Sequence, residues 1–186
     1  DRYDEVCILF AALVGFTEFA DLAEPKQALN VLNRFFDYFD RLTTQHQLER
    51  IKTIGDTYMV VGGLPFSHPN SISEIAQMAL DMQAAMTRLN AQLNCNFRLQ
   101  IGIHLGPAIA GVVNRSKLSC DLWGKTVIMA REMQSTELTE RSEVAAEVFD
   151  LLHQHFILEK RGTAVIADGE ELTTYVLQQR REGCIS

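Results

Sequence analysis

Hydrophobic and polar positions along the chain follow two different periods, which predict helices and strands in turn. Apolar residues recur every three or four positions from Pro25 to about Gln47, the pattern of an amphipathic helix. A second stretch with this period runs from Ile75 to Leu93, and a shorter helix is expected from Ala145 to His155. The apolar stripe of the first helix, which we expect to lie in the core, consists of Leu29, Leu32, Phe35, Phe36, Phe39 and Leu42.

Short apolar or alternating runs predict strands between these helices. The segment from Glu5 to Leu13 is continuously apolar and is interpreted as a buried strand. Apolar and polar residues alternate from Phe97 to Leu105, and Pro107 to Val113 is expected to form the partner of that strand. Further strands are predicted at Ile157 to Arg161 and Leu172 to Gln178. The order of helices and strands indicates an α/β fold.

A β-hairpin is predicted in the middle of the chain. Its strands are Arg50 to Ile54 and Thr57 to Val61, and the Gly-Asp turn between them is a typical hairpin signal. The carboxylate of Asp56 is therefore expected at the hairpin tip. Because side chains alternate along a strand, Arg50 and Lys52 are expected to point to the same face.

Composition and charge narrow the classes of function. The 186 residues are 47% hydrophobic and 22% charged, which suits one globular domain spanning residues 1–186. The net charge of -7 argues against nucleic-acid partners and anionic membrane surfaces. No apolar run reaches the roughly 18 residues of a membrane segment. The four cysteines form no cluster, which favours a cytoplasmic setting, and the absence of an initial Met suggests a domain excised from a longer protein.

The first strand is followed by a segment suited to phosphate oxygens. Gly15 and Thr17 break the strand, and Thr17 is expected to cap the helical turn that starts at Glu18. Free backbone N–H groups and the helix dipole at such a point attract anions. We therefore predict that Gly15, Phe16 and Thr17 bind phosphate.

Three segments resemble the motifs of the class III nucleotide cyclases, the adenylyl and guanylyl cyclase catalytic domains. They are LFAALVGFT at 9–17, IKTIGDTYMVVGGLP at 51–65 and SCDLWGKTVIMAREM at 119–133. The resemblance implies the class III cyclase fold, an α/β (α+β) fold with a ferredoxin-like βαββαβ core, an antiparallel sheet and flanking helices. It also implies a homodimer, or a heterodimer with a related cyclase domain, around a shared nucleotide cleft.

The resemblance also implies a reaction and the residues that serve it. Adenylyl-type members convert ATP to 3',5'-cyclic AMP and pyrophosphate with Mg2+ or Mn2+ held by two carboxylates. By position, Asp56 corresponds to one metal ligand, and Lys52 with Asp121 corresponds to the pair that reads adenine. Asp56 could instead be a plain turn residue, and Lys52 and Asp121 an exposed lysine and a capping aspartate.

Several positions depart from the family pattern. Ala12 stands at the other metal position, Ile128 and Glu132 at the catalytic Asn and Arg positions, and Ala167 at the phosphate-binding Lys position. Arg131 lies one residue early, about 100° around a helix, and so does not replace the arginine. Loss of one such electrostatic group lowers a rate by about 10² or more. The expected function is an adenylyl-type cyclase whose activity is impaired or lost.

Two alternatives remain for the function. The chain could be a pseudocyclase, a dimerising regulatory or nucleotide-binding module without chemistry. It could also be a cyclase of altered specificity, acting on another nucleoside triphosphate, in which Arg131 or Arg98 supplies the missing positive charge.

Overall fold

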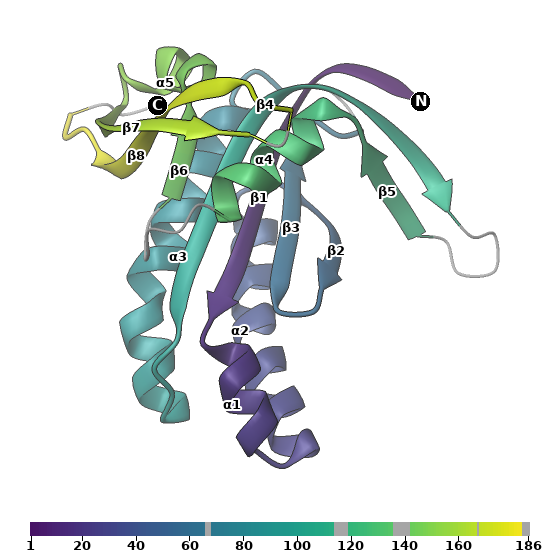
Figure 1. Ribbon diagram of the computed structural model, residues 1–186, viewed down its shortest axis with the longest axis vertical. Coiled ribbons are helices and arrows are strands. Elements are labelled where there is room, and N and C mark those ends of the chain that lie inside the picture. The colour runs from purple at the N-terminus through teal and green to yellow at the C-terminus, as the bar shows by residue number, and fades with distance from the viewer. Residues whose placement is uncertain (66–67, 114–118, 136–141, 167, 184–186) are drawn as a thin grey trace.

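One eight-stranded sheet organises the molecule, with helices on both of its faces (Figure 1). The computed structural model describes residues 1–65, 68–113, 119–135, 142–166 and 168–183. Along the chain the elements are β1 (Arg2–Val14), α1 (Phe16–Leu22), α2 (Pro25–Gln45), β2 (Glu49–Ile54), β3 (Thr57–Gly62), α3 (Ser71–Leu93), β4 (Arg98–Val113), β5 (Ser119–Trp123), α4 (Lys125–Ser135), β6 (Ser142–Ala145), α5 (Ala146–Leu152), β7 (Phe156–Val165) and β8 (Glu171–Arg180).

The order of the strands confirms the predicted ferredoxin-like core. The sheet runs β2-β3-β1-β4-β6-β8-β7, and β5 pairs with β4 off this path. Neighbouring strands are antiparallel except for β4 and β6, which are parallel. The first part of the chain forms the βαββαβ unit, with α2 and α3 behind the sheet and α4 in front of it (Figure 1). Apart from the separate strand predicted at Pro107 to Val113, each predicted helix and strand is present, with ends shifted by a few residues.

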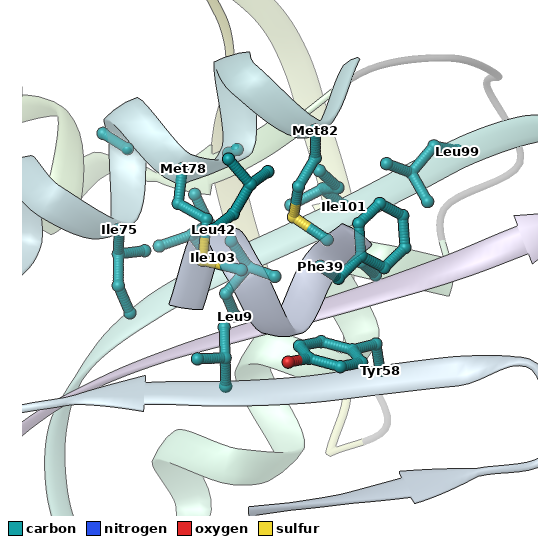
Figure 2. Packing of buried hydrophobic residues seen from close by; sticks show 14 of the residues in the cluster. Leu9, Phe39, Leu42, Tyr58, Ile75, Met78, Met82, Leu99, Ile101 and Ile103 are labelled. Atoms are coloured by element: carbon teal, nitrogen blue, oxygen red, sulfur yellow. The ribbon is translucent and has the colours of Figure 1, made fainter. Parts of the chain in front are cut away.

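The main hydrophobic core lies between the sheet and helices α2 and α3 (Figure 2). Phe39 and Leu42 of α2 are buried there as predicted, against Tyr58 of β3 and Met82 of α3. The prediction for Leu29 was wrong, because its side chain is 57% exposed. Ala28, one residue earlier, is buried instead, and the next residue of a helix is rotated by about 100°.

A second core covers the opposite face of the sheet. Ile8 and Phe10 of β1 and Met59 of β3 pack there with Leu122 of β5 and Ala130 of α4. Strand β1 is therefore buried on both faces, which explains its continuous apolar sequence.

The predicted strand break before Pro107 was wrong, because β4 runs without interruption from Arg98 to Val113. Strand β4 pairs with β1 along one side, and with β6 and then β5 along the other. Pro107 lies opposite a register shift in β1 between Tyr3 and Val6. Because the ladder is irregular at this bulge, a residue without an N–H donor fits there.

No helix in the described parts of the chain has the length and apolar character of a membrane span.

Candidate active site

A lysine from β2 and an aspartate from β5 form an ion pair at the edge of the second core. The Nζ atom of Lys52 donates a hydrogen bond of 2.7 Å to Oδ2 of Asp121. The other carboxylate oxygen, Oδ1, accepts a hydrogen bond of 2.8 Å from the backbone N–H of Leu122. The two side chains are 38% and 23% exposed, so solvent or a ligand can reach both. The fold thus joins residues that are 69 positions apart in the sequence.

A β-bulge directs Lys52 toward Asp121. Arg50 is opposite Val60 and Lys52 is opposite Met59, so one extra residue lies between them in β2. The prediction that Arg50 and Lys52 share a face was therefore wrong, because a bulge reverses the alternation. Arg50 points to the other side, where its guanidinium donates two hydrogen bonds to Asp40. Without the bulge Lys52 would not reach Asp121.

Asp56 lies at the hairpin tip, next to the end of β1. Its backbone oxygen accepts a hydrogen bond of 3.2 Å from Leu13, and Thr57 is in register with Ala12. Ala12, which we expect at the other metal position of the family pattern, thus lies in β1 next to the hairpin tip and carries a methyl group. In the described part of the chain, no three His, Cys, Asp or Glu side chains are grouped as metal ligands. The residues present in one chain do not fit a two-carboxylate metal site.

Helix α1 starts earlier than predicted and has a glycine, not Thr17, as its N-cap residue. Gly15 is the N-cap residue in a left-handed conformation, with φ of 95°, and the helix starts at Phe16. Thr17 lies inside the first turn and makes no capping hydrogen bond, so its predicted capping role was wrong. The rings of Phe16 and Phe19 pack against Phe97 at centroid distances of 5.9 and 5.4 Å. These contacts fix the segment, and phosphate binding by Gly15, Phe16 and Thr17 stays a prediction.

Helix α4 carries Ile128 and Glu132, which the resemblance predicts at the positions of catalytic side chains. Ile128 is 56% exposed, and Glu132 follows it one turn later, partly buried. Lys125, one turn before Ile128, makes an ion pair of 2.9 Å with Glu170 and a second of 3.5 Å with Asp168. The hydrogen bond to Glu170 raises the pKa of Lys125.

Close backbone packing fixes α4 in place on the sheet. A Cβ atom on Gly102 of β4 would lie 2.1 Å from a backbone nitrogen of the helix, so only glycine allows this approach. Met129 and Met133 of α4 enclose the buried Ile166, which precedes the turn between β7 and β8. Ala167, at the family's lysine position, lies outside the described residues.

Sequence reasoning missed the interactions of His46. This side chain is 7% exposed, with Nδ1 2.7 Å from Glu74 and Nε2 2.8 Å from Asp81. The hydrogen bond to Asp81 makes the largest contribution to raising the pKa of His46. His46 joins the end of α2 to α3 and borders a cavity of about 350 Å³. No local motif marks it, because its partners are 28 and 35 residues away.

The fold and these motifs define a nucleotide cyclase catalytic domain, and comparison with known sequences agrees. The profile of the family described as Adenylate and Guanylate cyclase catalytic domain matches residues 1–179. The chain belongs to this family. An adenylate cyclase of Mycobacterium tuberculosis is 37% identical over 181 residues, 97% of this chain and 41% of that protein. Human guanylate cyclase soluble subunit beta-2 is 36% identical over 180 residues, 96% of this chain and 29% of that protein.

Solved structures share the fold at low sequence identity. The guanylate cyclase domain of RhGC from Catenaria anguillulae, in complex with GTP, has a TM-score of 0.92 at 22% identity, covering 97% of this chain and all of that one. The adenylyl cyclase CyaB from P. aeruginosa has a TM-score of 0.92 at 18% identity, covering 98% and 97%. The chain spans less than half the length of the curated relatives above. Adenylyl and guanylyl cyclases both occur among its relatives.

Proposed function

We propose that this domain reads the adenine base of a nucleotide through Lys52 and Asp121. The ammonium group can donate a hydrogen bond to an adenine ring nitrogen, while the carboxylate accepts one from the exocyclic amine. Guanine presents the reverse pattern of donors and acceptors. Its carbonyl oxygen would face the carboxylate of Asp121, and two acceptors cannot form a hydrogen bond. The observation that carries the proposal is the contact of 2.7 Å between the two side chains, since it brings a donor and an acceptor together at an accessible place. The domain is then of the adenylyl type.

We further propose that turnover of ATP by this chain is slow or absent. The family reaction requires the ribose 3'-hydroxyl to attack the α-phosphorus while pyrophosphate leaves. Ala12 supplies no carboxylate, and Ile128 offers an apolar side chain where an amide would orient the ribose. Glu132 replaces a positive charge with a negative one, which opposes the charge that develops on the phosphoryl group. Of the two carboxylates expected to hold Mg2+ or Mn2+, this chain would supply only Asp56.

A second copy of the domain is the partner that this proposal requires. Three large apolar side chains, Ile109, Trp123 and Ile128, are each about half exposed on β4, β5 and α4. Ile109 and Trp123 are cross-strand neighbours, so they form one apolar surface. One related structure is described as a dimeric guanylyl cyclase domain, and another as monomeric. Sedimentation of this chain at tens of micromolar should give a dimer, whereas a single-chain mass would count against the assembly.

Product formation tests the proposed function directly. The chain and its Ala12→Asp variant are incubated at high concentration with manganese and ATP, GTP, CTP or UTP. We expect no cyclic product from the chain, and cyclic AMP as the only product if the variant is active. Cyclic AMP from the unaltered chain at a rate similar to active relatives would refute the assignment of impaired turnover. Products from GTP, CTP or UTP would support the altered-specificity alternative, with Arg131 or Arg98 as the first residues to replace.

The number of positions that depart from the family pattern favours the pseudocyclase alternative. Replacing Ala12 by aspartate leaves Ile128 and Glu132 unchanged, both of them on α4. A folded, dimeric Ala12→Asp variant that forms no product from any of the four nucleotides would support a regulatory or nucleotide-binding module. Such a module would act through its partner and its ligand.

A further inference from the structure

The carboxylate of Asp40 links helix α2 to both strands of the central hairpin. Nη1 of Arg50, in β2, donates hydrogen bonds of 3.1 and 2.8 Å to its two oxygens. The hydroxyl of Tyr58, in β3, donates a hydrogen bond of 2.6 Å to Oδ1. Arg50 and Tyr58 also contact each other, since the guanidinium carbon lies 5.4 Å from the centre of the ring. One side chain of α2 thus holds a residue of each strand.

The tyrosine of this network is held firmly in the core. Tyr58 is fully buried, and its ring packs against Phe36 and Phe39 at centroid distances of 5.6 Å (Figure 2). Burial raises the pKa of Tyr58, so the hydroxyl stays protonated and can donate to Asp40. Asp40 and Arg50 are each 39% exposed, and solvent therefore screens the charges of their ion pair. The contribution that we assign to the ion pair is a defined position for Arg50, and not stability.

The position of Arg50 matters because the β-bulge of β2 begins there. One extra residue, Ile51, lies between Arg50 and Lys52 in the ladder with β3, and it packs against the second core. Strand β2 is the last strand at one edge of the sheet, where β3 is its neighbour. The register of such a strand is held from one side, and a shift of one residue turns every side chain to the other face. Such a shift would turn Lys52 away from Asp121.

We infer that Asp40 is a positioning residue for base recognition. It holds Arg50 on the α2 side of the sheet, which keeps the bulge directly after Arg50. The bulge in turn directs Lys52 toward Asp121. Asp40 lies on the other side of the sheet from this pair, so it acts through Arg50 and not by contact with the base. The inference rests on the proposed reading of adenine by Lys52 and Asp121.

Competition binding of ATP and GTP to the intact chain and its variants tests this role. Asp40→Ala removes the carboxylate, and Arg50→Met removes its partner at a position exposed to solvent, which gives the same test should the first variant not fold. Each variant should lower the ratio of ATP to GTP affinity by about tenfold, the effect of one hydrogen bond to a charged group. Arg50→Lys keeps a positive charge and should retain part of the preference. Lys52→Glu should lower the ratio less in the Asp40→Ala background than in the unaltered chain, since both changes act on one contact.

A matched control separates positioning from a general loss of stability. Thr43→Val removes the other hydroxyl next to Tyr58, at 2.9 Å, and leaves Asp40 and Arg50 in contact. It should lower the melting temperature without changing the ratio of ATP to GTP affinity. A ratio unchanged in Asp40→Ala and Arg50→Met, or lowered equally in Thr43→Val, would overturn the inference and leave the base reading intact. Equal binding of ATP and GTP by the unaltered chain would overturn the base reading as well.

Discussion

Substitution of Gly102 by alanine tests how α4 is held on the sheet. The added Cβ atom would lie 2.1 Å from the backbone nitrogen of Gln134, 2.3 Å from the oxygen of Ala130 and 2.7 Å from the carbonyl carbon of Met133. All three neighbours are backbone atoms, which cannot rotate away. Non-bonded carbon contacts are comfortable near roughly 3.5 Å, so the helix has to retreat by more than about 1 Å.

The energetic consequence follows from the tight packing around this glycine. Inserting one methyl group into a filled core costs about 1–3 kcal/mol, and the upper end applies because no side chain can yield. For a domain of this size a loss of about 3 kcal/mol lowers the melting temperature by about 6 to 12 °C. The displaced helix carries Ile128 and Glu132, so ligand binding should weaken together with stability.

Thermal and urea unfolding of Gly102→Ala, compared with Gly106→Ala, measures this effect. A Cβ atom on Gly106 meets the hydroxyl of Thr126 at 2.7 Å, the end of a side chain that can rotate. Its rotation breaks the hydrogen bond from Thr126 to Pro107, so we expect a smaller loss of about 1–2 kcal/mol. Equal losses for the two variants, or a loss under about 1 kcal/mol for Gly102→Ala, would refute direct packing of α4 on the backbone of β4.

Three further predictions concern polar groups. Folding raises the pKa of His46, so its bridge to Asp81 should stabilise the chain fully below about pH 6.5 and progressively less as the pH rises through the pKa of the folded state. A His46→Gln variant should therefore show a larger fall in melting temperature at about pH 6 than at about pH 9. An equal fall at both pH values would contradict this. Tyr58→Phe removes a buried hydroxyl that donates to Asp40 at 2.6 Å and should cost about 1–3 kcal/mol in urea unfolding. A neutral result would show that the hydrogen bond of Tyr58 adds no stability beyond the ion pair of Asp40 with Arg50. Lys125→Ala should leave the melting temperature almost unchanged, because exposed ion pairs contribute little, and a large fall would show a structural role.

The helices and core strands could be predicted because their signals are local. The apolar stripe of α2 and the Gly-Asp turn formed by Gly55 and Asp56 each fix one element without reference to the rest of the chain. The unbroken course of β4 and the place of Thr17 inside the first turn of α1 could not be predicted in this way. Pro107 is compatible with an unbroken strand only because β1 has an irregularity opposite it, and the left-handed conformation of Gly15 starts α1 before Thr17 can cap it.

The candidate site was harder to predict than the helices and strands, because it depends on contacts between residues far apart in the sequence. The resemblance indicated Lys52 and Asp121, but their contact requires a bulge in β2 that no sequence period reveals. The ion pair of Lys125 with Glu170 joins residues 45 positions apart, and no pattern in the sequence indicates that these two side chains meet. Such pairs depend on how the strands are ordered in the sheet, so they become visible only in the folded chain.

The central claim is that Lys52 and Asp121 distinguish adenine from guanine, and competition binding of ATP and GTP tests it most directly. The chain and its Lys52→Glu variant are compared at equal concentration, with ATP, GTP, CTP and UTP as competitors of one labelled nucleotide. The account predicts that ATP binds more tightly than GTP to the chain and that the variant loses this preference, because a carboxylate cannot donate to the adenine ring nitrogen. Equal binding of all four nucleotides by the chain, or an unchanged preference in the variant, would contradict it.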